Sequence, residues 1–261
     1  FMGVAATIIA GIRGQAMKIH LFKPLLIVGV LLMLWQMVAT LGSFPHYIFP
    51  SPQAVGQQLF THAELLWQHT QVTLLEICLG LLLGFLFGLI SALLLSFSRQ
   101  ISAVLLPILV ISQAIPVFAI APLLVLWFGY GMASKIVMSV LIIYFPVTAA
   151  CYDGLRNTPQ AWLDLAKTFN ISPLRLLLKV RLPAALPAFA SGLRIAVSVA
   201  PIGAVVGEWV GSSEGLGYLM IHANARMQVD LMFAALLILV AISLCLYFSI
   251  DCLLHRFIWS V

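Results

Sequence analysis

The chain has 261 residues, of which 63% are hydrophobic and only 8% are charged, with a formal net charge of +5. A soluble domain carries about 25% charged residues, so this composition excludes an ordinary water-facing surface and predicts an all-α, polytopic membrane protein. The basic residues are scattered along the chain, so no nucleic-acid partner is expected.

The chain opens with a segment, 1–23, that precedes the first long apolar run. Residues 1–16 resemble an extension or tag, because a more typical start lies at Met17 in MKIHLFKPLL. The apolar part of 1–16 has no clear basic region before it, unlike a signal peptide. We therefore expect 1–23 to be cytoplasmic and assign no function to 1–16.

Six apolar runs follow that are long enough to cross a bilayer as helices, which takes about 20 residues. They lie at 24–43, 71–97, 102–127, 133–152, 185–209 and 231–254. Together they predict a six-span transmembrane domain over 24–254, followed by a short tail, 255–261. The third run contains Pro107, Pro116 and Pro122, so we expect a kinked or broken helix there that faces protein or a cavity.

The basic residues orient these spans. Ten of them fall on one side of the predicted membrane: Arg13, Lys18, Lys23, Arg99, Arg156, Lys167, Arg175, Lys179, Arg181 and Arg256. The other side has only Lys135 and Arg226. The positive-inside rule therefore places both termini and the segment 153–184 in the cytoplasm.

Glycines recur every four residues in the second and fifth spans. They are Gly80, Gly84, Gly88, Gly203, Gly207 and Gly211. Small residues at this spacing share one helix face and let neighbouring backbones approach closely. These glycines could serve ordinary helix packing or a gating role. In either case we expect their faces to contact protein instead of lipid.

The polar segment 153–184 predicts a helical hairpin between the fourth and fifth spans. Thr158 is suited to cap the first helix, with Pro159 at its first position. Apolar residues then follow at i, i+3, i+4 and i+7 and form one face. They are Trp162, Leu165, Ala166 and Phe169.

The turn and the second helix have signals of their own. Asn170 tolerates the left-handed conformation that ends helices, and Ser172 then caps a helix that starts at Pro173 and stops before Pro183. The basic residues of this helix are Arg175, Lys179 and Arg181. The hairpin is suited either to lie on anionic headgroups or to dock on another protein.

The spacing in this segment resembles the EAA loop of ABC-importer permeases: Glu-Ala-Ala, three residues, Gly, nine residues, Ile, any residue, Leu-Pro. The matching positions, in order, are Asp164, Leu165, Ala166, Asn170, Val180, Leu182 and Pro183. The chain departs from the pattern by Asp for Glu, Leu for the first Ala and Asn for Gly. Asp is chemically close to Glu, and Asn is the next residue after Gly to adopt left-handed backbone.

The likeness extends from about Pro50 to the end of the chain. It is carried by FPSPQAV (49–55), QAIPVFAIAPLLVLWFGYG (113–131) and GEWVGSSEGLGYLM (207–220). These stretches resemble the nitrate, sulfonate, taurine and thiamine-precursor branch of the permeases. Residues 200–235 are most similar to permeases for hydroxymethylpyrimidine, a thiamine pyrimidine precursor, with a sulfonate, taurine or nitrate importer as the alternative.

The resemblance implies a type I ABC-importer permease fold with a cytoplasmic coupling helix that sits on a separate ATP-binding subunit. The residues it assigns to this contact are Trp162, Asp164, Leu165, Ala166, Phe169, Asn170, Ser172 and Arg175. The chain has no GxxxxGK[ST] motif, so it is expected to be a transport subunit and not an enzyme. It is expected to hold no cofactor of its own, with ATP and Mg on the partner ATPase.

Three further partners follow from the resemblance. They are an extracytoplasmic substrate-binding protein, a second permease copy that forms a homodimer or a heterodimer, and the lipid of a bacterial inner membrane. Histidines and cysteines here lack metal-ligand spacing, so no metal centre is expected. A membrane enzyme would need clustered acids or histidines, and a secondary transporter usually has acids at mid-membrane.

Candidate residues for the transport pathway or a gate are few. Arg194 is a charge well inside a span, suited to face the bundle interior or to snorkel to the cytoplasmic interface. Glu76 and Glu208 fall near the outer boundary, where they are interfacial or, for Glu208, part of an outer gate or docking surface. A flat, neutral pyrimidine suits amide and aromatic contacts. The remaining candidates are Gln113, Pro116, Phe118 and Trp209.

Overall fold

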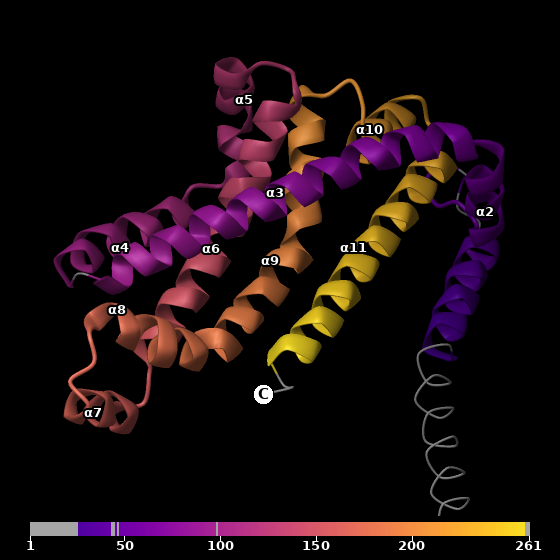
Figure 1. Cartoon of the computed structure of the whole chain (residues 1–261). Helices are drawn as coiled ribbons and strands as arrows, with labels where there is room; N and C mark the ends of the chain where they lie inside the picture. The colour runs from indigo at the N-terminus through magenta and orange to yellow at the C-terminus, as the bar shows by residue number, and fades with distance from the viewer. Residues whose placement is uncertain (1–25, 43–44, 46, 98, 259–261) are drawn as a thin grey trace, which may run out of the picture.

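The computed structural model describes residues 26–42, 45, 47–97 and 99–258. The expected N-terminal segment 1–23 and the end of the expected tail lie outside these residues. In chain order the helices are Leu26–Leu41, α2 (Pro52–Thr61), α3 (Ala63–Phe97), α4 (Arg99–Ala114), α5 (Val117–Phe128), α6 (Met132–Arg156), α7 (Gln160–Thr168), α8 (Pro173–Leu176), the π-helical segment η1 (Leu177–Arg181), α9 (Leu182–Gly211), α10 (Leu216–Ala225) and α11 (Val229–Ile258). Regular structure in the described part is helical throughout, which confirms the all-α fold (Figure 1).

Among the described residues, four helical stretches are long and apolar enough to cross a membrane, and they correspond to the second, fourth, fifth and sixth expected spans. The third expected span is broken: α4 and α5 meet at a 98° bend beside Pro116. Proline lacks a backbone N–H and disfavours helical backbone in the residue before it, so the break falls where the sequence predicts it. The described part of the first expected span, Leu26–Leu41, is apolar but too short by itself to count as a span, so the number six stays a prediction.

The central helix α6 packs against α3 on one side and α9 on the other. A Cβ added at Gly84 of α3 would lie 2.7 Å from Ile143 Cγ2, and one at Gly203 of α9 would lie 2.7 Å from Ser139 Cα. Such distances leave no room for a side chain, so the two glycine ladders allow close helix packing, as their spacing predicts.

Short helices close one end of the bundle. Val55 of α2 and Leu216 of α10 share a buried apolar cluster with residues of α11. Ser51 caps α2 by accepting a hydrogen bond from the Ala54 N–H, and the Trp35 indole N–H donates to the Pro50 carbonyl at 3.0 Å. These contacts, with the packing of Trp35 against Phe233, hold the helix Leu26–Leu41 beside α2 and the start of α11.

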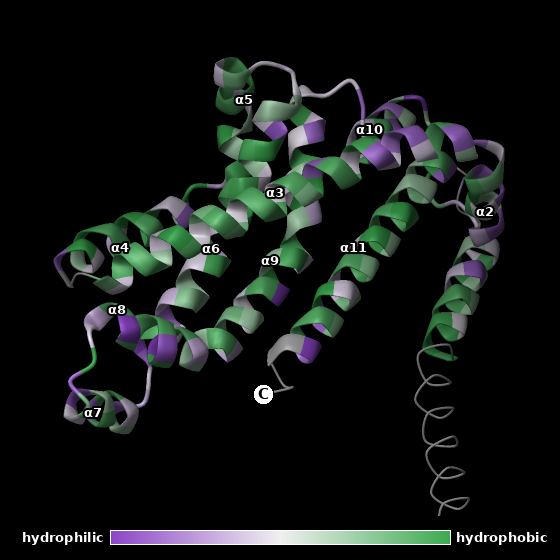
Figure 2. Cartoon of the chain, in the orientation of Figure 1, coloured by the Kyte–Doolittle hydropathy of each residue, from purple (hydrophilic) through white to green (hydrophobic). Residues whose placement is uncertain are grey.

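Apolar side chains cover much of the outer surface of the long helices. Figure 2 shows hydrophobic residues along their length, with hydrophilic residues gathered near α8 and near α10. Many large side chains, among them Leu82 and Phe87 of α3, are exposed in the isolated chain. A surface of this kind needs lipid or another protein chain around it.

The hairpin of residues 153–184 differs from its prediction in two ways. Thr158 does not cap α7: its hydroxyl donates to the Leu155 carbonyl at 3.1 Å, and Pro159 takes the capping position instead. The second helix does not stop before Pro183 but continues through η1 into α9, as one stretch of 39 residues, Pro173–Gly211. The wider π turn bonds the Leu182 N–H to the Leu177 carbonyl, which lets the chain pass Pro183 without the usual proline clash.

Candidate functional site

Helix α7 lies outside the helical bundle, next to α8 (Figure 1), and exposes large apolar side chains. Trp162, Leu165 and Phe169 are 52%, 60% and 72% exposed, whereas Ala166 is buried. A groove of about 430 Å³ runs between α7 and the start of α9. It is lined by Trp162, Leu165, Ala166, Phe169, Ile171, Lys179, Val180 and Pro183. The predicted apolar face therefore exists, and three of its four residues are open to a partner.

Asp164 lies on the polar side of α7. It accepts hydrogen bonds from Lys167 Nζ at 2.9 Å and from Gln160 Nε2 at 3.1 Å, which lower the pKa of its carboxyl group. A lowered pKa keeps the carboxylate ionised to a lower pH than usual, so α7 carries a fixed negative charge next to its apolar face.

The turn after α7 has the predicted left-handed residue. Asn170 has φ 51°, and its N–H donates to the Lys167 carbonyl at 3.0 Å. Ser172 takes the extended backbone of a cap before α8, although its side chain makes no capping hydrogen bond. Arg175 is exposed on α8. Seven of the eight residues assigned to coupling are thus exposed, and the eighth, Ala166, is buried where it lines the groove.

The candidate pathway residues do not form one site. Gln113 and Pro116 line a cavity of about 400 Å³ at the α4–α5 bend, together with Tyr144 of α6. Phe118 is exposed and does not line it, and Trp209 lines a separate cavity of about 360 Å³ beside α10. The bend cavity is therefore the place where two of the six candidates meet.

Arg194 pairs with an acid that sequence reasoning did not single out. Its Nε lies 2.6 Å from Asp251 Oδ1 of α11, and the two side chains are 27% and 30% exposed. The pair joins α9 to α11. The sequence contained a signal for this pair: Asp251 is an acid close to the end of the sixth predicted span, and a charge inside a span such as Arg194 needs a counterion.

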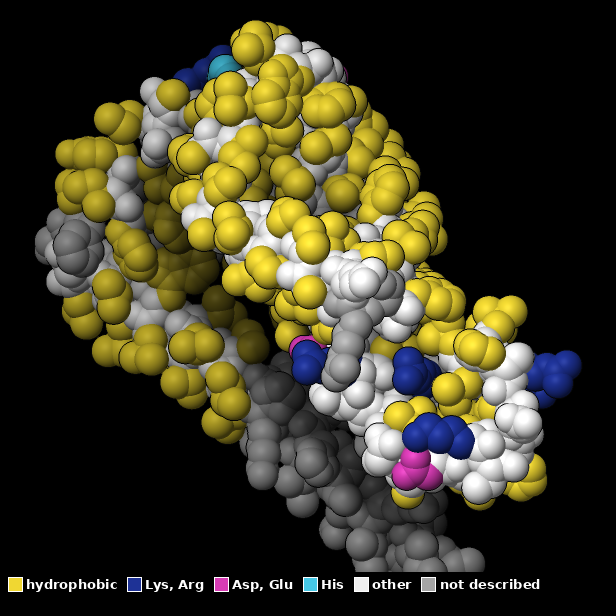
Figure 3. All heavy atoms as spheres, turned by 90° about the vertical axis from the view of Figure 1, so that its left-hand side faces the viewer, with side chains coloured by type: hydrophobic (Ala, Val, Ile, Leu, Met, Phe, Trp, Pro, Cys, Tyr) yellow, Lys and Arg dark blue, Asp and Glu magenta, His cyan; other side chains and the backbone are white. Residues whose placement is uncertain are grey.

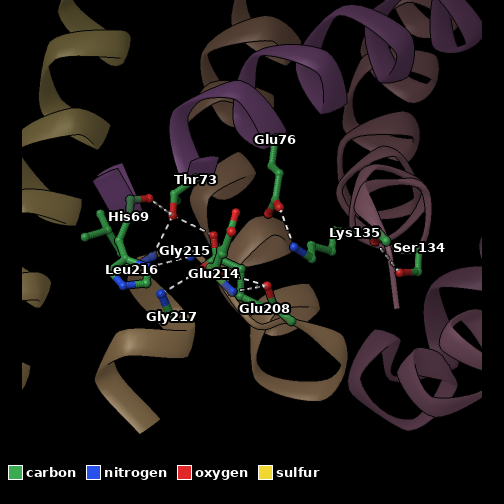
Figure 4. A network of polar contacts seen from close by, with 12 residues as sticks. His69, Thr73, Glu76, Ser134, Lys135, Glu208, Glu214, Gly215, Leu216 and Gly217 are labelled. Atoms are coloured by element: carbon green, nitrogen blue, oxygen red, sulfur yellow. Dashed lines mark hydrogen bonds and ion pairs between the residues drawn. The ribbon is translucent and has the colours of Figure 1, made fainter. Parts of the chain in front are cut away.

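Glu76 and Glu208 are buried between helices instead of exposed at the surface of the molecule. Figure 4 shows them between α3, α6 and α9. Glu76 Oε1 lies 2.9 Å from Lys135 Nζ, and the side chains of this pair are 0% and 7% exposed. Helix packing closes them off from the surface, and the ion pair compensates part of the cost of burying two charges.

Glu208 belongs to a network that holds the start of α10 (Figure 4). Three consecutive backbone N–H groups point at side chains of other helices. The Gly215 N–H donates to His69 Nδ1 at 2.9 Å, the Leu216 N–H to Thr73 Oγ1 at 2.8 Å and the Gly217 N–H to Glu208 Oε2 at 2.5 Å. The first N–H groups of a helix have no partner inside it, so this arrangement fixes α10 to α3 and α9.

Sequence reasoning missed His69 and Thr73. Together with Glu76 they lie at i, i+4 and i+7 on α3, which places three polar side chains on one face of its N-terminal part. Such a polar stripe inside a span indicates contact with protein instead of lipid.

Long apolar helices and a broken span packed into one helical bundle define a multi-pass membrane protein. Residues 84–258 match the family described as binding-protein-dependent transport system inner membrane component. The chain belongs to this family, and it is a multi-pass protein of the inner membrane.

Three relatives illustrate the family. The chain is 98% identical over 245 residues to a probable ABC transporter permease protein of Haemophilus influenzae, which covers 94% of this chain and 100% of the relative. It is 38% identical to the formylaminopyrimidine transport permease protein ThiX of Halalkalibacterium halodurans, over 83% of this chain and 87% of the relative. It is also 38% identical to the riboflavin transport system permease protein RibX of Chloroflexus aurantiacus, over 84% and 82% of the two chains.

The fold has a counterpart among solved structures. A chain of the inward-facing MetNI methionine ABC transporter superposes with a TM-score of 0.64 at 22% identity, over 75% of this chain and 97% of that one. This likeness confirms the fold of an ABC-importer permease. At 22% identity it gives no information about the substrate.

Proposed function

We propose that the chain is the permease subunit of an ATP-driven importer and that α7 docks on a separate ATP-binding subunit. The observation that carries this proposal is the exposed apolar face of α7, with Trp162 and Phe169 beside a groove of about 430 Å³. Large exposed aromatic residues at a concave surface are typical of protein interfaces. The EAA-like spacing and the family membership support an ATPase as the protein that covers them.

The route from α7 into the membrane supports a lever mechanism. The stretch Pro173–Gly211 is helical without a break over 39 residues, a length of about 58 Å at 1.5 Å per residue. It joins the segment next to α7 to the last turn of α9, which contains Glu208. Movement of α7 by a closing ATPase would be passed along this helix to the network around α10. In this proposal the same motion switches the pathway between inward-facing and outward-facing states.

The proposed substrate is a thiamine pyrimidine precursor, hydroxymethylpyrimidine or a relative. The likeness to a formylaminopyrimidine permease supports it. The cavity at the α4–α5 bend supports it chemically, because Gln113 and Tyr144 offer amide and aromatic contacts to a flat heterocycle. An external binding protein would deliver this substrate, and a second permease copy would complete the pathway.

Two tryptophans of similar exposure provide a matched test of docking. Trp162 on α7 is 52% exposed and Trp67 on α3 is 57% exposed. Trp162→Ala should weaken co-purification of the ATPase by about thirtyfold, as expected for an interface hot spot, and should lower uptake with it. Trp67→Ala should change neither. Equal retention of the ATPase by both variants would rule out docking through α7.

The substrate is tested separately by uptake in cells that lack the chain. Uptake of labelled hydroxymethylpyrimidine should fall on deletion and return with the wild-type gene, and unlabelled hydroxymethylpyrimidine should compete better than riboflavin or taurine. Unchanged hydroxymethylpyrimidine uptake on deletion, with riboflavin or taurine uptake lost, would reject the proposed substrate and leave the importer proposal standing.

A further inference from the structure

A polar cavity of about 270 Å³ lies at the basic end of the bundle, away from the α7 groove and the bend cavity. It is lined by Leu95, Ser96, Ser102, Tyr152, Leu155, Arg156 and Arg181. These residues come from α3, α4, α6 and η1, so four elements converge on it. Its volume is many times the roughly 30 Å³ that a water molecule occupies, which leaves room for a larger polar group.

The charges in this cavity favour an anion. Among the described residues that line it, two are arginines and none is acidic. The Nε of Arg181 is closed to solvent and has no hydrogen-bond partner within the described part of the chain, where Arg156 likewise has no ion pair. A buried donor without an acceptor is costly, and guanidinium groups match the paired oxygens of a phosphate.

An apolar groove of about 490 Å³ continues from this cavity along α4. The two share Ser102, Tyr152 and Arg156. The rest of the groove is formed by Ala103, Leu106, Pro107, Val110 and Ile111. Their spacing of i, i+3, i+4, i+7 and i+8 places them on one face of α4, over a length of about 12 Å. The polar cavity therefore opens directly onto the apolar groove along α4.

We propose that this composite site binds an anionic phospholipid, with its phosphate between Arg156 and Arg181 and an acyl chain along α4. Figure 3, viewed from the side of α4 and α8, shows basic side chains at the lower edge of a broad hydrophobic surface. Basic pockets between helices on the cytoplasmic side of membranes are suited to anionic headgroups. The phosphate chemistry would also suit a free phosphate, but the adjoining groove favours a lipid. The proposal requires only that the chain lies in a membrane.

Native mass spectrometry of the full-length chain, titrated with phosphatidylglycerol, tests the proposal. Arg156→Gln and Arg181→Gln should each weaken binding by about fivefold, and the double variant by about 25-fold. Arg175→Gln, an exposed arginine on α8 outside the cavity, is the charge-matched control and should bind like the wild type. Phosphatidylethanolamine, which has no net charge, should bind more weakly than phosphatidylglycerol.

A second variant separates a lipid from a free phosphate. Ala103→Trp fills the groove from an exposed position, so it should weaken phosphatidylglycerol binding and leave glycerol 3-phosphate binding unchanged. A phosphatidylglycerol with a diazirine on its acyl chain should label the peptide that contains 103–111 in the wild-type protein, whatever the variants do to folding.

Four results would overturn the proposal. The first is wild-type phosphatidylglycerol binding by the double arginine variant. The second is inorganic phosphate binding as tightly as the lipid, with Ala103→Trp having no effect on either. The third is photolabelling outside α4. The fourth is loss of a dimer in Ala103→Trp with lipid binding unchanged, which would make the groove a contact between two copies.

Discussion

Asn170 ends α7 with a φ of 51°, a backbone region that most L-residues avoid. Asn170→Gly should keep this turn, whereas Asn170→Val should strain it by about 1–2 kcal/mol and tilt α7. We expect wild-type uptake for the glycine variant and impaired uptake with weaker ATPase co-purification for the valine variant. Normal uptake with valine would show that coupling does not depend on the left-handed turn.

The buried ion pair between Glu76 and Lys135 should affect the stability of the protein measurably when one partner is removed. Lys135→Met would leave a buried carboxylate without its counterion, which costs about 3–5 kcal/mol. The melting temperature in detergent should therefore fall clearly. The double variant Glu76→Leu with Lys135→Met should recover much of the loss, because an apolar pair has no charge to desolvate.

Lys167 offers a control for this prediction. Its ion pair with Asp164 has the same length of 2.9 Å, but its side chain is 72% exposed. Surface pairs of this kind contribute at most about 1 kcal/mol, so Lys167→Met should leave the melting temperature nearly unchanged. Similar melting temperatures for Lys135→Met and Lys167→Met would mean that the Glu76 pair is solvated in the native protein.

At the scale of helices, α6 is held at Ser139 between glycines of its two neighbours. A Cβ at Gly80 of α3 would contact the Ser139 side chain, and a Cβ at Gly203 of α9 would lie 2.7 Å from Ser139 Cα. The second contact is to backbone, which cannot rotate away. The separation of α6 and α9 therefore depends on the missing side chain at Gly203.

Gly203→Ala is expected to destabilise the bundle. Alanine favours a helix over glycine by about 1 kcal/mol, but the overpacking cost of about 1–3 kcal/mol outweighs it here. Gly56→Ala in α2 has nothing within 4 Å of the added Cβ and should be neutral or slightly stabilising. Thermal melting of both variants in detergent checks this, and equal effects would argue against tight packing of α6 on α9.

At the scale of the whole molecule, the arrangement in the membrane makes a direct prediction. Lys167 and Arg226 are expected on opposite sides. In a background without Cys78, Cys151 and the two cysteines of α11, Arg226→Cys should react with an impermeant maleimide in intact spheroplasts. Lys167→Cys should react only after the membrane is opened, and the reverse pattern would invert the proposed orientation.

Much of this protein follows from local signals in its sequence. Apolar run length determines the long spans, Pro116 breaks the third of them, and Asn170 turns the chain after α7. Each of these rests on residues close together in the chain, where backbone preference and hydrophobic period act directly. The EAA-like spacing is local in the same sense, and it located the exposed surface of α7.

The rule that proline ends a helix failed at Pro183, because a π turn accommodates this proline. The sequence predicts that the second hairpin helix ends before Pro183, but the π turn at Leu177–Arg181 carries it into α9. Whether a helix continues past a proline depends on the packing that its residues gain by continuing. Here a continuous helix places Ala185 and Leu177 in a buried cluster with α6, which the stop would have lost.

Only the tertiary structure decided which polar groups meet. Arg194 and Asp251 are 57 residues apart, and His69 and Gly215 are 146 apart. Periodicity shows which face of a helix avoids lipid, but it cannot show which helix that face will contact. Because a buried charge or N–H is costly without a partner, these distant pairings depend on how the helices pack together, as does the polar cavity beside Arg181.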